Sequence, residues 1–228
     1  MSARATSGST VRQLQEPLRA RYIEDPQEAI TFKRVRAVNA PDSDVMHGSV
    51  VATSPEYDDV VWRYGTDRKL GGPHDAPNAG EILCAALAAC MDNIIRMLAD
   101  HLAIDLADVQ VEVTGDVDVR GCMAIDPGVR PGFRWLAVDT RLTPAAGTDE
   151  RRLAALTASA ERLCVTLDTL RHGTPVEVRW QTDTPNQQGG KELLDARHPE
   201  PHAATRGPCP GQLPTLDLKP NHKEVPCH

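Results

Sequence analysis

The feature that most constrains the fold is a long, apolar helix predicted over residues 79–102. Its apolar side chains recur at intervals of three and four residues, which places them on one stripe: Leu83, Leu87, Cys90, Ile94, Met97 and Leu98. The preceding segment, residues 70–80, is rich in glycine and proline and is predicted to be a loop. Asn78 and Glu81 have the spacing of a capping box, which predicts that the helix begins at the end of this loop.

The segments after this helix predict two strands, a second helix and a final strand. Residues 109–119 and 133–142 alternate apolar and polar side chains, and they are expected to form a long antiparallel pair. A second long helix is predicted from near Asp149 to Gly173, with apolar side chains again three and four residues apart: Leu153, Leu156, Ala160, Leu163, Leu167 and Leu170. Val176–Trp180 is expected to form the last strand.

Three extended segments, at residues 30–38, 48–54 and 59–64, are predicted to form a meander before the first long helix. Strands therefore come in runs that single long helices separate. This order predicts an α+β fold with antiparallel sheet, and it disfavours a parallel, doubly wound fold.

Composition divides the 228-residue chain into three zones. Residues 1–27 form a polar N-terminal segment that we expect to be partly helical. Residues 28–182 carry nearly all the periodicity and are predicted to be one domain. Residues 183–228 hold eight of the 18 prolines and four of the eight histidines, which predicts an extended tail. The cysteines and histidines of this tail lack the short spacings of zinc modules, so we expect neither a metal nor a cofactor.

Charge and hydropathy exclude several classes of function. The net charge of −7 and the pI near 5.6 disfavour binding to nucleic acid. The longest apolar run, from Ile82 to Met91, is about half the length that a membrane span requires, so no span is expected. The N-terminus lacks the apolar stretch of a secretory signal, and six cysteines are too few for a disulfide scaffold. We therefore expect a cytoplasmic protein with reduced thiols.

Two of the six cysteines face the predicted interior. Cys90 lies on the apolar stripe of the first long helix, and Cys164 borders the stripe of the second. If the two helices pack together, the thiols can come within disulfide range, although both can equally serve as small apolar core residues. The other four are interpreted as packing or incidental residues: Cys84, Cys122, Cys209 and Cys227.

Two sequence strings resemble the OsmC/Ohr family of osmotically inducible and organic hydroperoxide resistance proteins. They are LGGPHDAPNAGEILCAALAACMD, residues 70–92, and AERLCVTLDTLRHGTPVEV, residues 160–178. The resemblance covers about residues 28–182. It implies an intertwined α+β homodimer, with two long central helices between antiparallel sheets and with active sites at the subunit interface.

The resemblance also implies a thiol chemistry. Cys90 would attack an organic hydroperoxide, alkyl or lipid, and become a sulfenic acid, and Cys164 would resolve it as a disulfide that a dithiol reductant restores. The family places an activating arginine on the loops before the first long helix, where this chain has Arg68 and, as the weaker candidate, Arg63. Glu81 is interpreted first as a helix cap and second as a partner of that arginine.

Two positions depart from the family pattern. Gly80 stands where the best-characterised peroxidases of the family have a glutamate, and Val165 follows Cys164 where many relatives have proline. An alternative hypothesis is therefore a non-catalytic module that binds a small apolar ligand and uses its cysteines as core residues. A cysteine hydrolase is a poor third hypothesis, because it needs a histidine base close to the thiol, and only His74 in the loop is a candidate worth checking.

Overall fold

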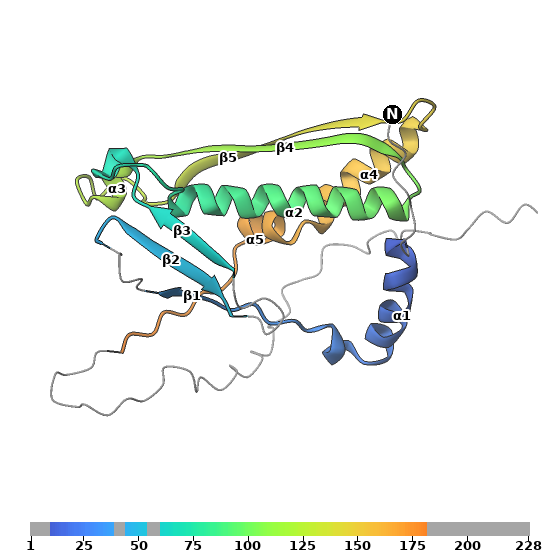
Figure 1. The fold of residues 1–228 in the computed structure, drawn as a ribbon, viewed down its shortest axis with the longest axis horizontal. Helices are drawn as coiled ribbons and strands as arrows, with labels where there is room; N and C mark the ends of the chain where they lie inside the picture. Colours follow the sequence, from blue (N-terminus) through green and yellow to red (C-terminus); the bar gives the residue numbers. More distant parts are fainter. Residues whose placement is uncertain (1–9, 39–43, 54–59, 182–228) are drawn as a thin grey trace, which may run out of the picture. The chain divides into compact units, whose positions relative to one another are not determined.

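The computed structural model describes residues 10–38, 44–53 and 60–181 (Figure 1). The chain divides into two compact units. The first unit spans residues 1–176 and contains every helix and strand of the described residues. The second spans residues 177–228, of which only 177–181 are described. The whole Pro/His-rich tail, residues 183–228, therefore lies outside the described residues.

The first unit begins with helix α1 (Val11–Glu24) and the short helix η1 (Pro26–Ala29). Pro17 lies inside α1, so the helix continues through the proline, and the described part of the N-terminal segment is largely helical. The Val11 N–H donates to the Asp100 carboxylate over 2.7 Å, and this bond fastens the start of α1 near the end of the long helix that follows.

A three-stranded antiparallel meander comes next, formed by β1 (Val35–Val38), β2 (His47–Ala52) and β3 (Val61–Gly65) in that order. The first predicted segment, residues 30–38, is a strand only in its last four residues. Val35 pairs with Ala52, the last residue of β2, so the described pairing of β1 with β2 ends there.

The long helix α2 (Ala79–His101) begins where the sequence predicts it. The capping box is present, since Glu81 N–H donates to the Asn78 side chain over 3.0 Å and Asn78 N–H donates to the Glu81 carboxylate over 2.8 Å. By length and composition alone α2 is apolar enough to cross a membrane. Core helices pass the same test, and α2 buries its central stripe against β4, α4 and α5.

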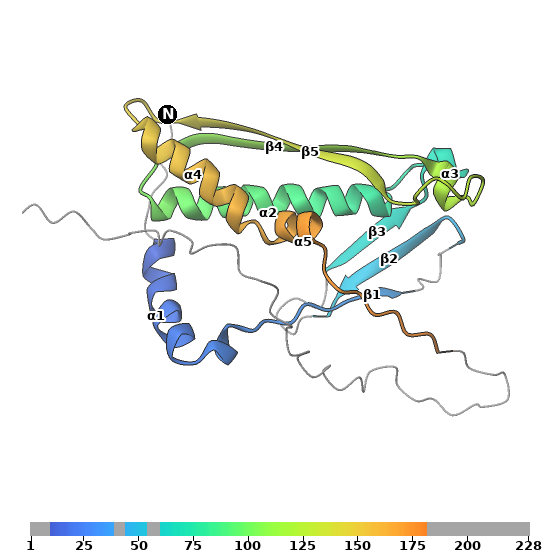
Figure 2. The same ribbon diagram turned by 180° about the vertical axis from the view of Figure 1, so that it is seen from behind.

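The strands β4 (Leu106–Val117) and β5 (Phe133–Pro144) form the expected long antiparallel pair, joined through the short helix α3 (Val119–Cys122). Figures 1 and 2 show this pair running along α2, with α4 and α5 beside α2. Four residues of α2 are fully buried: Leu87, Met91, Ile95 and Ala99. Leu87 belongs to the predicted stripe, and the other three each lie one position after a predicted residue. The α+β prediction with antiparallel sheets and central helices is confirmed.

The second long helix differs from the prediction because it is broken into α4 (Glu150–Leu163) and α5 (Val165–His172). Cys164 separates them with extended backbone angles, φ −74° and ψ 107°. Its N–H still donates to the Ala160 carbonyl, and its carbonyl still accepts from Asp168 N–H. The break therefore interrupts the backbone at one residue while the apolar periodicity continues across it.

The predicted final strand, Val176–Trp180, is wrong for the described chain. These residues form neither helix nor strand, and Val176, Val178 and Trp180 are all largely exposed. Alternating side chains favour a strand only where a partner strand supplies the hydrogen bonds. Among the described residues, no strand pairs with this segment.

Candidate active site

Two cysteines come together in the core that α2, α4 and α5 share. Cys90 lies midway along α2 and is half-buried, whereas Cys164 has 0% of its surface exposed. Both are free thiols, they lie in one apolar cluster, and each acts on the pKa of the other. The residues that pack around them are apolar: Leu87, Met91, Ile95, Val109, Ala160 and Leu167. The fold thus brings the two inward-facing thiols into one core cluster.

The first residues of α5 follow the break at Cys164. An α-helix leaves its first N–H groups without partners in the helix, and here those of Val165 and Thr166 lower the pKa of Cys90. The Thr166 hydroxyl lowers the same pKa. Neither residue is identified by sequence analysis, because no glycine or proline marks the break that precedes them.

These contacts give the two thiols opposite pKa shifts. Burial raises the pKa of Cys90, but the hydrogen bonds from Thr166, Cys164 and Val165 outweigh it and hold the pKa below its usual value. Burial raises the pKa of Cys164, and the neighbouring Cys90 sulfur raises it further. Cys90 is therefore the thiol that ionises first, while Cys164 keeps its proton.

The arginines expected to activate Cys90 lie elsewhere in the described chain. Arg68 follows β3 in the short helix η2 (Arg68–Leu70), and its guanidinium lies 3.5 Å from the Pro73 carbonyl oxygen. Arg63 lies in β3 and acts electrostatically on Asp75. Neither is among the groups that act most strongly on the pKa of Cys90. Activation by either arginine stays a prediction.

Glu81 and His74 lie together at the start of α2. Glu81 caps the helix, and its carboxylate is 3.7 Å from the His74 ring, which is equally far from the Asp67 carboxylate. His74 has a left-handed backbone, φ 56°, and faces these two acids. Within the described residues it makes no contact with Cys90, so the geometry gives a cysteine hydrolase no base. The role of Glu81 as an arginine partner stays a prediction.

A histidine bridge fastens the loop before α2. The two ring nitrogens of His47 lie 2.9 Å from the Asp44 carboxylate and 2.8 Å from the Asp75 carboxylate. The hydrogen bonds to Asp75 and Asp44 raise the pKa of His47. A further bond of 3.2 Å joins the Asn78 amide to Asp67. The loop that leads into the helix is thus tied on both sides.

The remaining cysteines form no second thiol pair in the described part of the chain. Cys84 is half-buried, and burial together with the nearby Glu81 raises its pKa. Cys122 is exposed and donates to the Val119 carbonyl over 3.3 Å. Cys209 and Cys227 lie outside the described residues. Among the residues that are described, no group of three or more His, Cys, Asp or Glu side chains is arranged to hold a metal ion.

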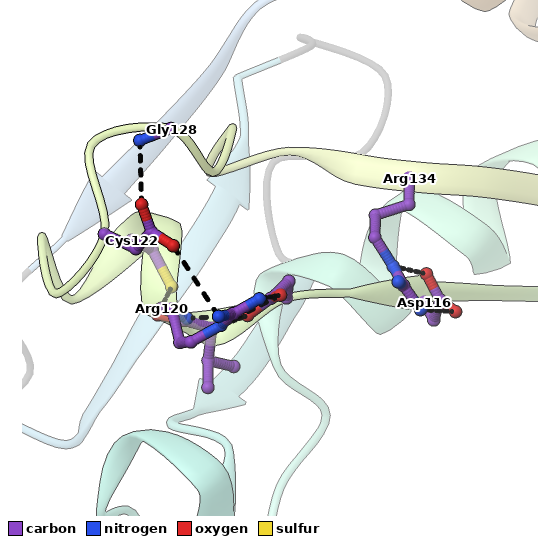
Figure 3. Close-up of polar contacts among 8 residues, drawn as sticks. Asp116, Arg120, Cys122, Gly128 and Arg134 are labelled. Atoms are coloured by element: carbon purple, nitrogen blue, oxygen red, sulfur yellow. Dashed lines mark hydrogen bonds and ion pairs between the residues drawn. The ribbon is translucent and has the colours of Figure 1, made fainter.

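Cys122 belongs to a polar cluster where β4 and β5 are joined (Figure 3). The Arg134 guanidinium meets the Asp116 carboxylate at 2.6 Å, and Arg120 meets Asp118 at the same distance. Hydrogen bonds from Arg120 lower the pKa of Asp118 to about 2. Arg120 and Arg134 are thus both paired with aspartates, and these ion pairs stabilise the connection between β4 and β5.

A cavity of about 760 Å³ lies between α2, β5, α4 and α5. Leucine, valine, phenylalanine and methionine side chains form most of its wall, with Arg130 and the paired Glu161 and Arg171 among the polar lining residues. Leu87, Met91 and Leu167 line it and also pack in the cluster around Cys164, but no cysteine lines the cavity. The structure therefore places an apolar hollow beside the thiol pair.

The family model for OsmC-like protein matches residues 72–179, the segment that holds both cysteines. An OsmC-like protein from Mycoplasma pneumoniae is similar in structure over 63% of this chain and 89% of its own, with 15% identity and a TM-score of 0.50. For an OsmC-like protein of unknown function from Vibrio cholerae the coverage is 61% and 94%, the identity 8% and the TM-score 0.50. No curated protein matches the chain. At these identities the likeness shows the fold alone.

Proposed function

Residues 72–179 belong to the OsmC-like protein family, and from this premise we propose that the chain is a thiol-dependent peroxidase that reduces organic hydroperoxides. One observation carries the proposal. Cys90, whose pKa is lowered, lies in the same apolar cluster as the buried thiol of Cys164. A lowered pKa favours the thiolate that acts as the nucleophile, and a second thiol in the same cluster can form a disulfide with its oxidised product.

The reaction then has three balanced steps. The Cys90 thiolate attacks the terminal oxygen of the hydroperoxide, the O–O bond breaks, and the alkoxide takes up a proton and leaves as the alcohol. The Cys164 thiol then attacks the sulfur of the Cys90 sulfenic acid, and a Cys90–Cys164 disulfide forms. The displaced hydroxide takes up the proton of the Cys164 thiol and leaves as water. A dithiol reductant attacks that disulfide and restores both thiols, while it is itself oxidised to a disulfide.

We also propose that the protein acts as a homodimer in the cytoplasm. Leu83 on α2 is 36% exposed, and the neighbouring cavity opens between apolar elements, so a second copy would cover surface that water otherwise contacts. Free thiols are typical of a reducing compartment. Sedimentation velocity across a range of concentrations would report the dimer directly.

Peroxide consumption tests the proposed activity. Cumene hydroperoxide is supplied with dithiothreitol, and its loss is followed in the native protein and in Cys90→Ser, Cys164→Ser and Cys122→Ser. We expect Cys90→Ser to abolish consumption and Cys164→Ser to abolish the intramolecular disulfide. Cys122 is exposed and lies outside the cluster that holds Cys90 and Cys164. Cys122→Ser therefore serves as the matched control and should consume hydroperoxide as the native chain does. Consumption unchanged by Cys90→Ser would refute the proposal.

The apolar cavity favours a second candidate function, a module that binds a small apolar ligand without catalysis. Its support is that no cysteine lines this cavity of about 760 Å³. Titration of the thiols separates the two functions. A Cys90 pKa at or above the usual value of about 8.5 favours the binding module, and a lower value favours the enzyme.

A further inference from the structure

An ion pair joins α4 to α5 across the break at Cys164. The Arg171 guanidinium on α5 donates to the Glu161 carboxylate on α4 over 2.7 Å, and the two residues are ten positions apart. In an unbroken helix, side chains pair when they are three or four residues apart, whereas ten residues rise about 15 Å. The pair therefore forms only because the chain changes direction at Cys164, and Figure 2 shows that α5 does not continue the axis of α4.

Little else in the described chain fixes the direction of α5. Leu167 is its one buried side chain, and Val165 is 72% exposed. The Thr169 hydroxyl donates to the Val165 carbonyl, and the His172 ring lies 3.0 Å from the Asp168 carboxylate, so these groups bond within α5. Among the residues that the structure describes, the ion pair is the only side-chain hydrogen bond that joins α5 to α4.

The direction of α5 is coupled to the position of the second thiol. Cys164 is the single residue between the two helices, and its N–H and carbonyl keep their bonds to Ala160 and Asp168. Its ψ of 107° departs from the helical value of about −42°, so rotation at this residue swings α5 relative to α4. The Cys164 side chain is fully buried in the cluster that Cys90 packs against. An interaction that fixes the angle between the helices therefore also fixes the backbone to which this thiol is attached.

We propose that Glu161 and Arg171 are positioning residues, whose ion pair holds α5 bent away from α4 and keeps the Cys164 thiol where it can form a disulfide with Cys90. The inference deepens the proposed peroxidase and rests on it for its catalytic meaning. The pair acts on the sulfur chemistry only through the backbone of Cys164. The two side chains are 57% and 53% exposed, so the effect is modest and sensitive to salt.

Exchange with glutathione tests this role in the full chain. The Cys90 and Cys164 thiols reduce one glutathione disulfide to two glutathione thiols and become a disulfide themselves. Mass spectrometry of the two peptides gives the ratio of disulfide to dithiol protein, and hence the effective concentration of the two thiols for each other. We expect Arg171→Gln and Glu161→Gln each to lower this concentration about two- to fivefold, as for the loss of an exposed ion pair.

Three controls isolate the ion pair. The double variant Glu161→Gln with Arg171→Gln should fall no further than either single variant, because one substitution already removes the pair. The charge-reversed variant Glu161→Arg with Arg171→Glu should restore the native value. Arg162 has no ion pair within the described residues, so Arg162→Gln is the matched control, with no change expected. Far-UV circular dichroism confirms that each variant is folded, and the double glutamine variant decides the test if the charge-reversed one is not.

Two further measurements distinguish positioning from a general loosening of the structure. Salt at about 1 M should lower the native effective concentration toward that of Arg171→Gln and leave Arg171→Gln itself unchanged, because salt screens exposed pairs. The rate at which iodoacetamide alkylates Cys90 should be the same in both proteins, because the pair positions the other thiol. A drop in effective concentration that comes with an altered rate of Cys90 alkylation would overturn the positioning role.

The outcomes separate this inference from the proposed function. An effective concentration that is unchanged or higher in both single variants overturns the role of the pair, and so does an equal drop in Arg162→Gln. A drop specific to Glu161→Gln and Arg171→Gln in a protein that consumes hydroperoxide supports both proposals. The same drop in a protein that consumes no hydroperoxide supports the positioning role and refutes the peroxidase.

Discussion

Leu156 offers the sharpest test of how α4 is anchored to α2. Its side chain is fully buried, with 0% of its surface exposed, and it packs with Ala99 of α2 and with Ile104. Five half-buried leucines pack against this group: Leu98, Leu102, Leu106, Leu142 and Leu153. Because the neighbours come from separate elements, the site cannot collapse around a smaller side chain. We expect Leu156→Ala to cost about 3–4 kcal/mol of unfolding free energy, within the usual range for leucine truncation in a core.

The matched control is Leu163→Ala in the same helix. Leu163 is 41% exposed, so its truncation removes less buried surface and should cost under about 1 kcal/mol. Urea denaturation followed by circular dichroism measures both, and an unchanged slope with denaturant would show that the unfolded state is the same. For a chain of this size the Leu156 variant should melt about 6–16 °C lower. Equal costs for the two variants would refute the packing of α4 described above.

Two further predictions concern titration. Asp118 should titrate near pH 2 by NMR, and Arg120→Gln should return the pKa of Asp118 toward its ordinary value. The ion pair of Asp118 with Arg120 therefore stabilises the fold above the ordinary pKa of an aspartate, and this stabilisation is lost as the pH falls toward 2. The raised pKa of His47 means that its bridge to Asp44 and Asp75 stabilises the fold fully below about pH 6.5 and is lost as pH rises through the folded-state pKa. As the pH rises through this pKa, the melting temperature of His47→Gln should therefore fall less than that of the native protein. If the melting temperatures of the two proteins depend on pH in the same way, the stabilising role of the bridge is contradicted.

The parts of the fold that the sequence predicts best are those where a local signal coincides with the packing. The capping box at Asn78 and Glu81 fixes the first turn of α2, and the alternating residues of β4 and β5 pair with each other along their length. In both cases neighbouring residues supply the hydrogen bonds that define the element. Val176–Trp180 has an equally clear alternation but lacks a partner strand in the described chain, so the same pattern produces no strand there.

Of the candidate site, the sequence predicts only that the two cysteines face the interior. Helical periodicity places Cys90 and Cys164 inward, and the structure brings them together. The break at Cys164 could not be foreseen, because the apolar spacing runs through it unaltered and a single extended residue leaves no mark in composition. Val165 and Thr166, which lower the pKa of Cys90, follow that break, and nothing in the sequence marks them as its neighbours.

Because the capping box fixes where α2 begins, it also fixes how far Cys90 lies from the loop before the helix. Cys90 comes eleven residues after Ala79, the first residue of the helix, and at about 1.5 Å per residue the thiol lies about 17 Å along the axis. Asp67, next to Arg68, accepts a hydrogen bond from Asn78, the N-cap residue of α2. That interval exceeds the reach of any side chain, so an arginine held in this loop can meet a Cys90 thiol only by leaving its place or by belonging to another copy of the chain.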